Sequence, residues 1–128
     1  MYNLHSPAEA YRKIDFDARV AGADPGQLVL VCYEQLGTAL GSAIHAAQAS
    51  DNARKSAALT RALAALTALQ LGLDHGQPIA ATLSTLFDSA RHTVLNSVIH
   101  FDASALTRLK QDVTEIAGAL RSAVNVRE

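Results

Sequence analysis

The chain has 128 residues, of which 49% are hydrophobic and 18% are charged, and its net charge is -1. This length suits a single domain over residues 1–128, and the composition excludes an intrinsically disordered chain. The near-neutral charge argues against a nucleic-acid partner, and no apolar run reaches the roughly 18 residues that insertion across a membrane needs.

Residues 1–23 are predicted to form a short N-terminal cap segment rather than a helix of the main fold. Ser6 as N-cap, Pro7 at the first helical position and Glu9 in a capping box predict a short helix over residues 7–13. Residues 14–20 alternate polar and apolar side chains and are expected to be an extended connection. The N-terminus also lacks a basic stretch followed by an apolar one, so no secretory signal is visible.

The first long helix is predicted over residues 25–49. Asp24 and Gln27 form a capping box around Pro25. The apolar side chains then run without a break over residues 28–33. A helix that packs on one side needs only an apolar stripe, so something besides the core of the fold is expected to cover part of this run.

Cys32, within this apolar run, is the only cysteine of the chain. A disulfide within one chain is therefore impossible, which fits a reducing, cytoplasmic location. A cysteine in the middle of an apolar helix is expected to be a small buried hydrophobe. We expect its thiol to have a raised pKa and to be inert.

Three more helices are predicted, over residues 52–73, 78–99 and 103–123. The break Ser50-Asp51-Asn52 is expected to cap the first of these helices and Asp102 the last, and Gly76 is expected to end one helix in the left-handed conformation. The apolar stripe of the helix over 78–99 consists of Ile79, Leu83, Leu86, Phe87, Ala90, Val94 and Val98. Four helices of about 20 residues joined by short turns predict an all-α fold, an antiparallel up-down four-helix bundle with the N-terminal segment as a cap.

The ionisable residues show no catalytic pattern. No glutamate has a histidine three residues later, which removes the di-iron pattern of bundles. Asp88 and His92 are four residues apart and could share a metal or a proton, but such a pair is also common on exposed helix faces. His45 could accept a phosphate, although no lysine lies near it on its helix. We therefore expect a binding protein that is not an enzyme and that needs no metal or cofactor.

A colinear set of short motifs carries a resemblance to a known family. The set consists of Ala10-Tyr11, Ala23-Asp24-Pro25-x-Gln27-Leu28-Val29, Tyr33-Glu34, Leu71-Gly72-Leu73-Asp74 and Gly76-x-x-Ile79-Ala80-x-x-Leu83-Ser84-x-Leu86-Phe87-Asp88. In this order the motifs resemble the flagellar secretion chaperones of the FliS family, over roughly residues 2–121. Thr82 stands where the family has asparagine, Ser89-Ala90 replace a usual Tyr-Met, and the late tryptophan is absent.

The resemblance implies a cytoplasmic export chaperone. Such a protein binds the disordered C-terminal segment of flagellin, prevents premature polymerisation and delivers the subunit to a component of the flagellar export gate, without nucleotide or metal. The residues that we expect to contact this guest are Tyr11, Ile14, Val20, Leu28, Val29 and Tyr33. The alternative is a structural or regulatory bundle that uses the same apolar surface to form a homodimer.

Overall fold

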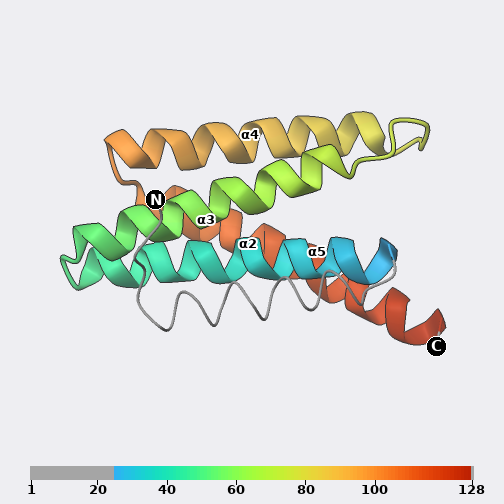
Figure 1. The fold of residues 1–128 in the computed structure, drawn as a ribbon, viewed down its shortest axis with the longest axis horizontal. Helices are drawn as coiled ribbons and strands as arrows, with labels where there is room; N and C mark the ends of the chain where they lie inside the picture. Colours follow the sequence, from blue (N-terminus) through green and yellow to red (C-terminus); the bar gives the residue numbers. More distant parts are fainter. Residues whose placement is uncertain (1–24, 128) are drawn as a thin grey trace, which may run out of the picture.

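The computed structural model describes residues 25–127, and these residues form four α-helices (Figure 1). The helices are α2 (Pro25–Gln48), α3 (Asn52–Leu71), α4 (Ala80–Ile99) and α5 (Ala103–Arg127). No strand occurs within the described part of the chain, so the all-α prediction is confirmed. The cap segment 1–23 and the predicted cap residue Asp24 lie outside the described residues.

The helices form a ring in which each helix packs against two others. The contact between α2 and α3 is the most extensive and that between α2 and α5 comes next. Helix α4 closes the ring through smaller contacts with α3 and, least of all, with α5. Consecutive helices run in opposite directions, as Figure 1 shows, which confirms the predicted up-down four-helix bundle.

The core is mainly aliphatic, in keeping with an aromatic content of only 5%. Its most deeply buried large side chains are no more than 2% exposed and come from every helix: Leu36, Leu40, Leu59, Leu66, Val94 and Leu106. Alanines fill the seam between α2 and α3, where Ala43, Ala58 and Ala62 are fully buried. Because alanine has the smallest helix-forming side chain, this seam lets the two helices approach closely.

The turn between α2 and α3 is a Schellman motif centred on Ser50. Ser50 has a φ of 56°, the left-handed conformation that glycine or asparagine usually supplies. The Asp51 N–H donates to the carbonyl of Ala46 at 2.9 Å, and the Ser50 N–H donates to that of Ala47 at 3.1 Å. The Asp51 carboxylate then accepts the N–H of Arg54 at 3.1 Å, so Asp51 is the residue of the predicted break Ser50-Asp51-Asn52 that caps α3.

The connection from α3 to α4 differs from the prediction at Gly76. Gly72 caps α3 with a φ of -86°, and among the described glycines none has a positive φ, so the prediction of a left-handed Gly76 is wrong. Asp74 supplies the local order instead, because its carboxylate accepts the Gly76 N–H at 3.0 Å and the Gln77 side-chain amide at 3.3 Å. These bonds, the one from Gly76 first, lower the pKa of Asp74.

The turn from α4 to α5 is closed by Asp102. Its carboxylate accepts the N–H of Ala105 at 3.0 Å, which confirms the predicted cap of α5. The Asp102 N–H donates to the hydroxyl of Ser97 at 3.4 Å, and Ser97 is a buried polar residue near the end of α4. These two bonds fix the direction in which α5 leaves α4.

Candidate partner-binding surface

The apolar run at the start of α2 is divided between the core and the surface. Residues 31–33 are 3–5% exposed, whereas Leu28, Val29 and Leu30 are half-buried and pack against the edge of the core. The bundle therefore encloses the first half of the run less completely than the second half. Three of the expected guest contacts lie outside the described residues: Tyr11, Ile14 and Val20.

Tyr33 faces inward. Its ring lies 6.1 Å from that of Phe87, centroid to centroid, with the two planes tilted by 47°. This contact joins the diagonal helices α2 and α4 across the centre of the bundle. Burial raises the pKa of the Tyr33 hydroxyl and that of the neighbouring Cys32 thiol. The prediction of a buried cysteine with a raised pKa is confirmed.

A groove of about 410 Å³ runs between α2 and α5 and includes an edge of Tyr33. Glycines let the two helices come close here: a Cβ atom at Gly37 would lie 3.6 Å from Val113 Cγ1, and one at Gly41 would lie 2.9 Å from Lys110 Cε. The side chain of Lys110 thus extends over Gly41. The groove combines an apolar wall with charged side chains at its rim.

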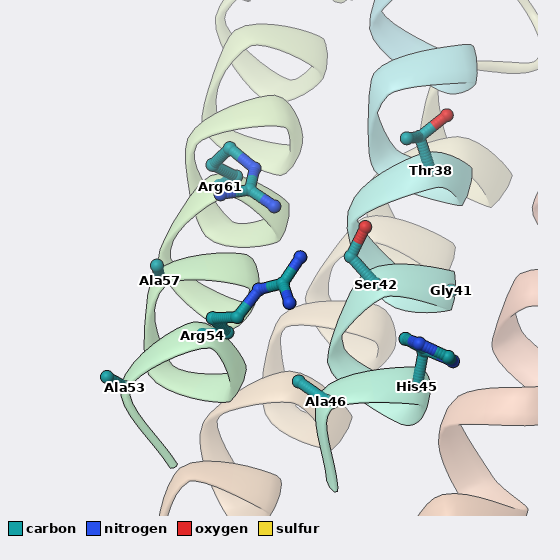
Figure 2. Close-up of a pocket in the computed structure, with 9 residues that line it drawn as sticks. All are labelled: Thr38, Gly41, Ser42, His45, Ala46, Ala53, Arg54, Ala57 and Arg61. Carbon is teal, nitrogen blue, oxygen red and sulfur yellow. The ribbon is translucent and has the colours of Figure 1, made fainter. Parts of the chain in front are cut away.

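A second groove, of about 480 Å³, lies between α2 and α3 (Figure 2). Figure 2 shows Arg54 and Arg61 reaching from α3 toward α2, which contributes Ser42 and His45. The residues that line this groove include no carboxylate. Arg54 and Arg61 are on α3, whereas His45 is on α2. A search for basic residues near His45 on its own helix therefore could not find them.

The outer face of α4 carries exposed aliphatic side chains that the bundle leaves uncovered. Leu95, Val98 and Ile99, which we call the α4 patch, are 46%, 57% and 76% exposed. The apolar stripe that the sequence shows on this helix includes Val98 and Ile79, but both are 57% exposed, so the stripe does not lie in the core over its whole length. The apolar stripe is wider than the surface through which α4 contacts its neighbours. Most of the buried residues of α4 are small, and its contact with α5 is the least extensive of the bundle.

A network of polar side chains connects α3 to α4 beside this patch. Arg91 donates from Nε to the Gln70 side-chain oxygen at 3.1 Å and from Nη2 to the Thr67 hydroxyl at 2.9 Å. Gln70 in turn donates from Nε2 to the Asp88 carboxylate at 3.1 Å. Gln70 engages one oxygen of Asp88, and among the described residues no hydrogen bond or ion pair joins Asp88 to His92. Within residues 25–127 no cluster of three or more His, Cys, Asp or Glu could hold a metal ion.

Comparison with known proteins identifies the family. The model of the family described as flagellar protein FliS matches residues 7–127, which is nearly the whole chain. The chain belongs to the FliS family. The flagellar secretion chaperone FliS of Salmonella typhimurium is 29% identical to it over 117 residues, which cover 89% of this chain and 87% of the relative. The resemblance that the short motifs carried is therefore confirmed.

FliS membership is consistent with the character of these surfaces. The family is one of chaperones, and the described surfaces offer an exposed apolar face and two grooves. No helix within residues 25–127 is both long and apolar enough to cross a bilayer. The α4 patch was missed from the sequence, although Leu95 and Ile99 lie one turn apart outside the apolar stripe of this helix, which was a signal for a second apolar face.

Proposed function

We propose that this FliS-family chain is a cytoplasmic export chaperone that binds the disordered C-terminal segment of flagellin. It keeps that segment from polymerising and delivers it to the flagellar export gate. The observation that carries the proposal is the α4 patch, because Leu95, Val98 and Ile99 are exposed although the bundle already has a complete core. An exposed aliphatic face on a well-packed protein usually marks a site of interaction.

The energetics favour a guest that covers more than this patch. Full burial of one large aliphatic side chain stabilises a complex by roughly 1.5–3 kcal/mol, and each residue of the patch is already partly covered. Ordering a disordered guest costs roughly 2–5 kcal/mol of the gross interaction energy. A guest that also contacts the start of α2 would gain the additional burial. We therefore retain the predicted contact set of Tyr11, Ile14, Val20, Leu28, Val29 and Tyr33 as part of the proposal.

The two ends of the proposed binding surface are far apart. Because α2 and α4 run in the same direction, Val29 near the start of α2 and Ile99 at the end of α4 lie toward opposite ends of the bundle. A helix of 20 residues is about 30 Å long. A guest that reaches both ends must run along the bundle. A disordered segment can do this, because it can wrap over a large surface as it binds.

Titration calorimetry and circular dichroism with a peptide of the flagellin C-terminus test the proposal. We expect a 1:1 complex and a gain of helical signal on mixing. Val29→Asp and Ile99→Asp should each weaken binding and leave most of the helical content, whereas Ala64→Asp, at an exposed position of α3, should bind as the unchanged chain does. An absence of heat with the unchanged chain at tens of micromolar would refute the proposal.

The alternative of a homodimer through the α4 patch has weaker support. Three exposed side chains form only a part of the roughly 800 Å² that each partner of a stable complex usually buries. Analytical ultracentrifugation separates the two functions. A stable dimer that flagellin peptide does not dissociate would favour the alternative.

A further inference from the structure

Arg91 is a half-buried cation whose partners are all neutral. Its guanidinium group has five N–H donors. Nε and Nη2 donate to the Gln70 side-chain oxygen and to the Thr67 hydroxyl. Within residues 25–127 no carboxylate oxygen lies within 4.0 Å of this guanidinium, and Nη1 has no acceptor. The side chain is therefore held in place while part of its donor capacity and all of its charge remain available.

Gln70 keeps the nearest acid away from this cation. The Gln70 amide accepts from Arg91 through its oxygen and donates to the Asp88 carboxylate through its nitrogen. Asp88 is one turn before Arg91 on α4, a spacing at which a direct ion pair is common. Because the Gln70 amide bridges Arg91 and Asp88, the Asp88 carboxylate does not bond directly to the guanidinium.

The α4 patch begins one turn beyond Arg91. Leu95 follows Arg91 by four residues and Ile99 follows Leu95 by four, so all three lie along the same side of α4, with Val98 beside them. Eight residues of helix span about 12 Å, which is slightly more than two turns. A cation with unused donors is thus followed, one turn later, by exposed aliphatic side chains over residues 95–99.

We propose that Arg91 binds the C-terminal carboxylate of the guest, while the last turns of the guest pack as a helix on the α4 patch. This inference rests on the proposed function, since it names the part of the flagellin segment that this surface takes. A chain terminus is the one place where a carboxylate directly follows the backbone of the last helical turn. The negative end of the helix dipole and the unpaired carbonyls of that turn would also face the guanidinium. Charge-assisted hydrogen bonds of this kind are about twice as strong as neutral ones.

The test compares two flagellin C-terminal peptides that are identical except that one ends in a free carboxylate and the other in an amide. The unchanged chaperone should bind the free acid roughly tenfold more tightly, the effect typical of one hydrogen-bonded charge. The preference should shrink as salt is raised, because the site is partly exposed. A merely structural Arg91 that links α3 to α4 cannot distinguish the two peptides.

Variants of the chaperone assign the preference to Arg91. Arg91→Gln should bind both peptides with nearly the same affinity, and Arg91→Lys should retain part of the preference. Arg108→Gln is the matched control, because Arg108 is exposed on α5 and donates to the Ser104 hydroxyl. It should keep the full preference. Thermal unfolding of each variant checks that α3 and α4 stay packed, and a variant that does not fold is replaced by the comparison of the two peptides on the unchanged chain.

The outcomes separate this inference from the proposed function. Equal binding of the acid and the amide by the unchanged chaperone would overturn the role of Arg91 and leave flagellin binding intact. A preference that persists in folded Arg91→Gln would place the carboxylate elsewhere and would also overturn the inference. If neither peptide binds, the proposed function itself fails.

Discussion

Arg121 in α5 forms an ion pair with Glu34 in α2, with 2.8 Å between Nη2 and Oε2. The two residues are 87 positions apart in the sequence, and their pair joins the first and last described helices at the rim of the groove between them. Their side chains are 52% and 28% exposed, respectively. Solvent therefore screens much of the attraction between the charges.

Removing this ion pair should have a small effect. Arg121→Gln is expected to lower the free energy of unfolding by only about 0.2–1 kcal/mol, and the loss should diminish in 1 M salt. Urea denaturation at low and high salt measures both effects. Arg108→Gln, which removes a cation bonded to a neutral hydroxyl, should show no such salt dependence. A loss above about 2 kcal/mol would mean that the pair orders the α2–α5 contact.

The left-handed residue in the first turn offers a stabilising substitution. Ser50→Gly should raise the free energy of unfolding by about 0.5–1 kcal/mol. A side chain in this conformation costs about 1–2 kcal/mol, and the larger backbone entropy that glycine loses on folding offsets part of the gain from removing it. Ala64→Gly, in the exposed interior of α3, should have the opposite sign and lose a similar amount. Thermal and urea unfolding of both variants measure the difference. If Ser50→Gly destabilises the chain, the turn is not held in the left-handed conformation.

Two glycines within helices should respond differently to alanine. Gly118 has no atom within 4 Å of the position of a new Cβ, so Gly118→Ala should stabilise α5 by about 0.5–1 kcal/mol. At Gly41 the new Cβ would lie 2.9 Å from Lys110 Cε, and this flexible side chain must move first. Gly41→Ala should therefore gain less than Gly118→Ala. Equal gains would show that Lys110 does not rest on Gly41 in solution.

The buried thiol of Cys32 and the buried hydroxyl of Tyr33 predict a loss of stability at alkaline pH. Burial raises the pKa of Cys32 and of Tyr33, so the folded chain keeps these protons at a pH where the unfolded chain releases them. Their contribution is complete below the unfolded pKa values, about 8.5 for cysteine and 10 for tyrosine, and is lost as pH rises from there toward the folded values.

Urea denaturation between pH 7 and 10.5 measures this loss as a slope. Cys32→Ala should flatten the slope that begins near pH 8.5, and Tyr33→Phe should flatten the part that begins near pH 10. Each substitution also changes packing, so the comparison is between slopes and not between absolute stabilities. Slopes that match the unchanged chain would show that neither group titrates differently on folding.

The local features of this fold were predictable because the residues that form them are neighbours in the sequence. Asp102 caps α5 as expected, and Asp51 within the predicted break Ser50-Asp51-Asn52 caps α3, since an N-cap needs only an aspartate and the next three residues. Gly76 misled the prediction, because Asp74 already orders that connection with its carboxylate. Ser50 was not identified as the left-handed residue, since serine is uncommon there.

The binding surface depends on distances between helices, which the sequence does not contain. The spacing of Val98 is that of a core residue, but its helix contacts its neighbours only along a narrower strip. The side chains that surround Arg91 come from α3 and α4, 18 to 24 residues apart, so no local motif could combine them. Leu28 and Val29 were identified from an unbroken apolar run, and their role in guest binding stays a prediction.

The turn at Ser50 and Asp51 has a consequence for how the chain folds. Asp51 belongs both to the motif that ends α2 and to the cap that begins α3, so this hairpin is specified by about ten consecutive residues and closes with almost no loop. Contacts between sequence neighbours form fastest, and the seam that they align is the largest of the bundle. We expect this pair of helices to assemble first as a nucleus, with α5 and then the loosely held α4 added afterwards.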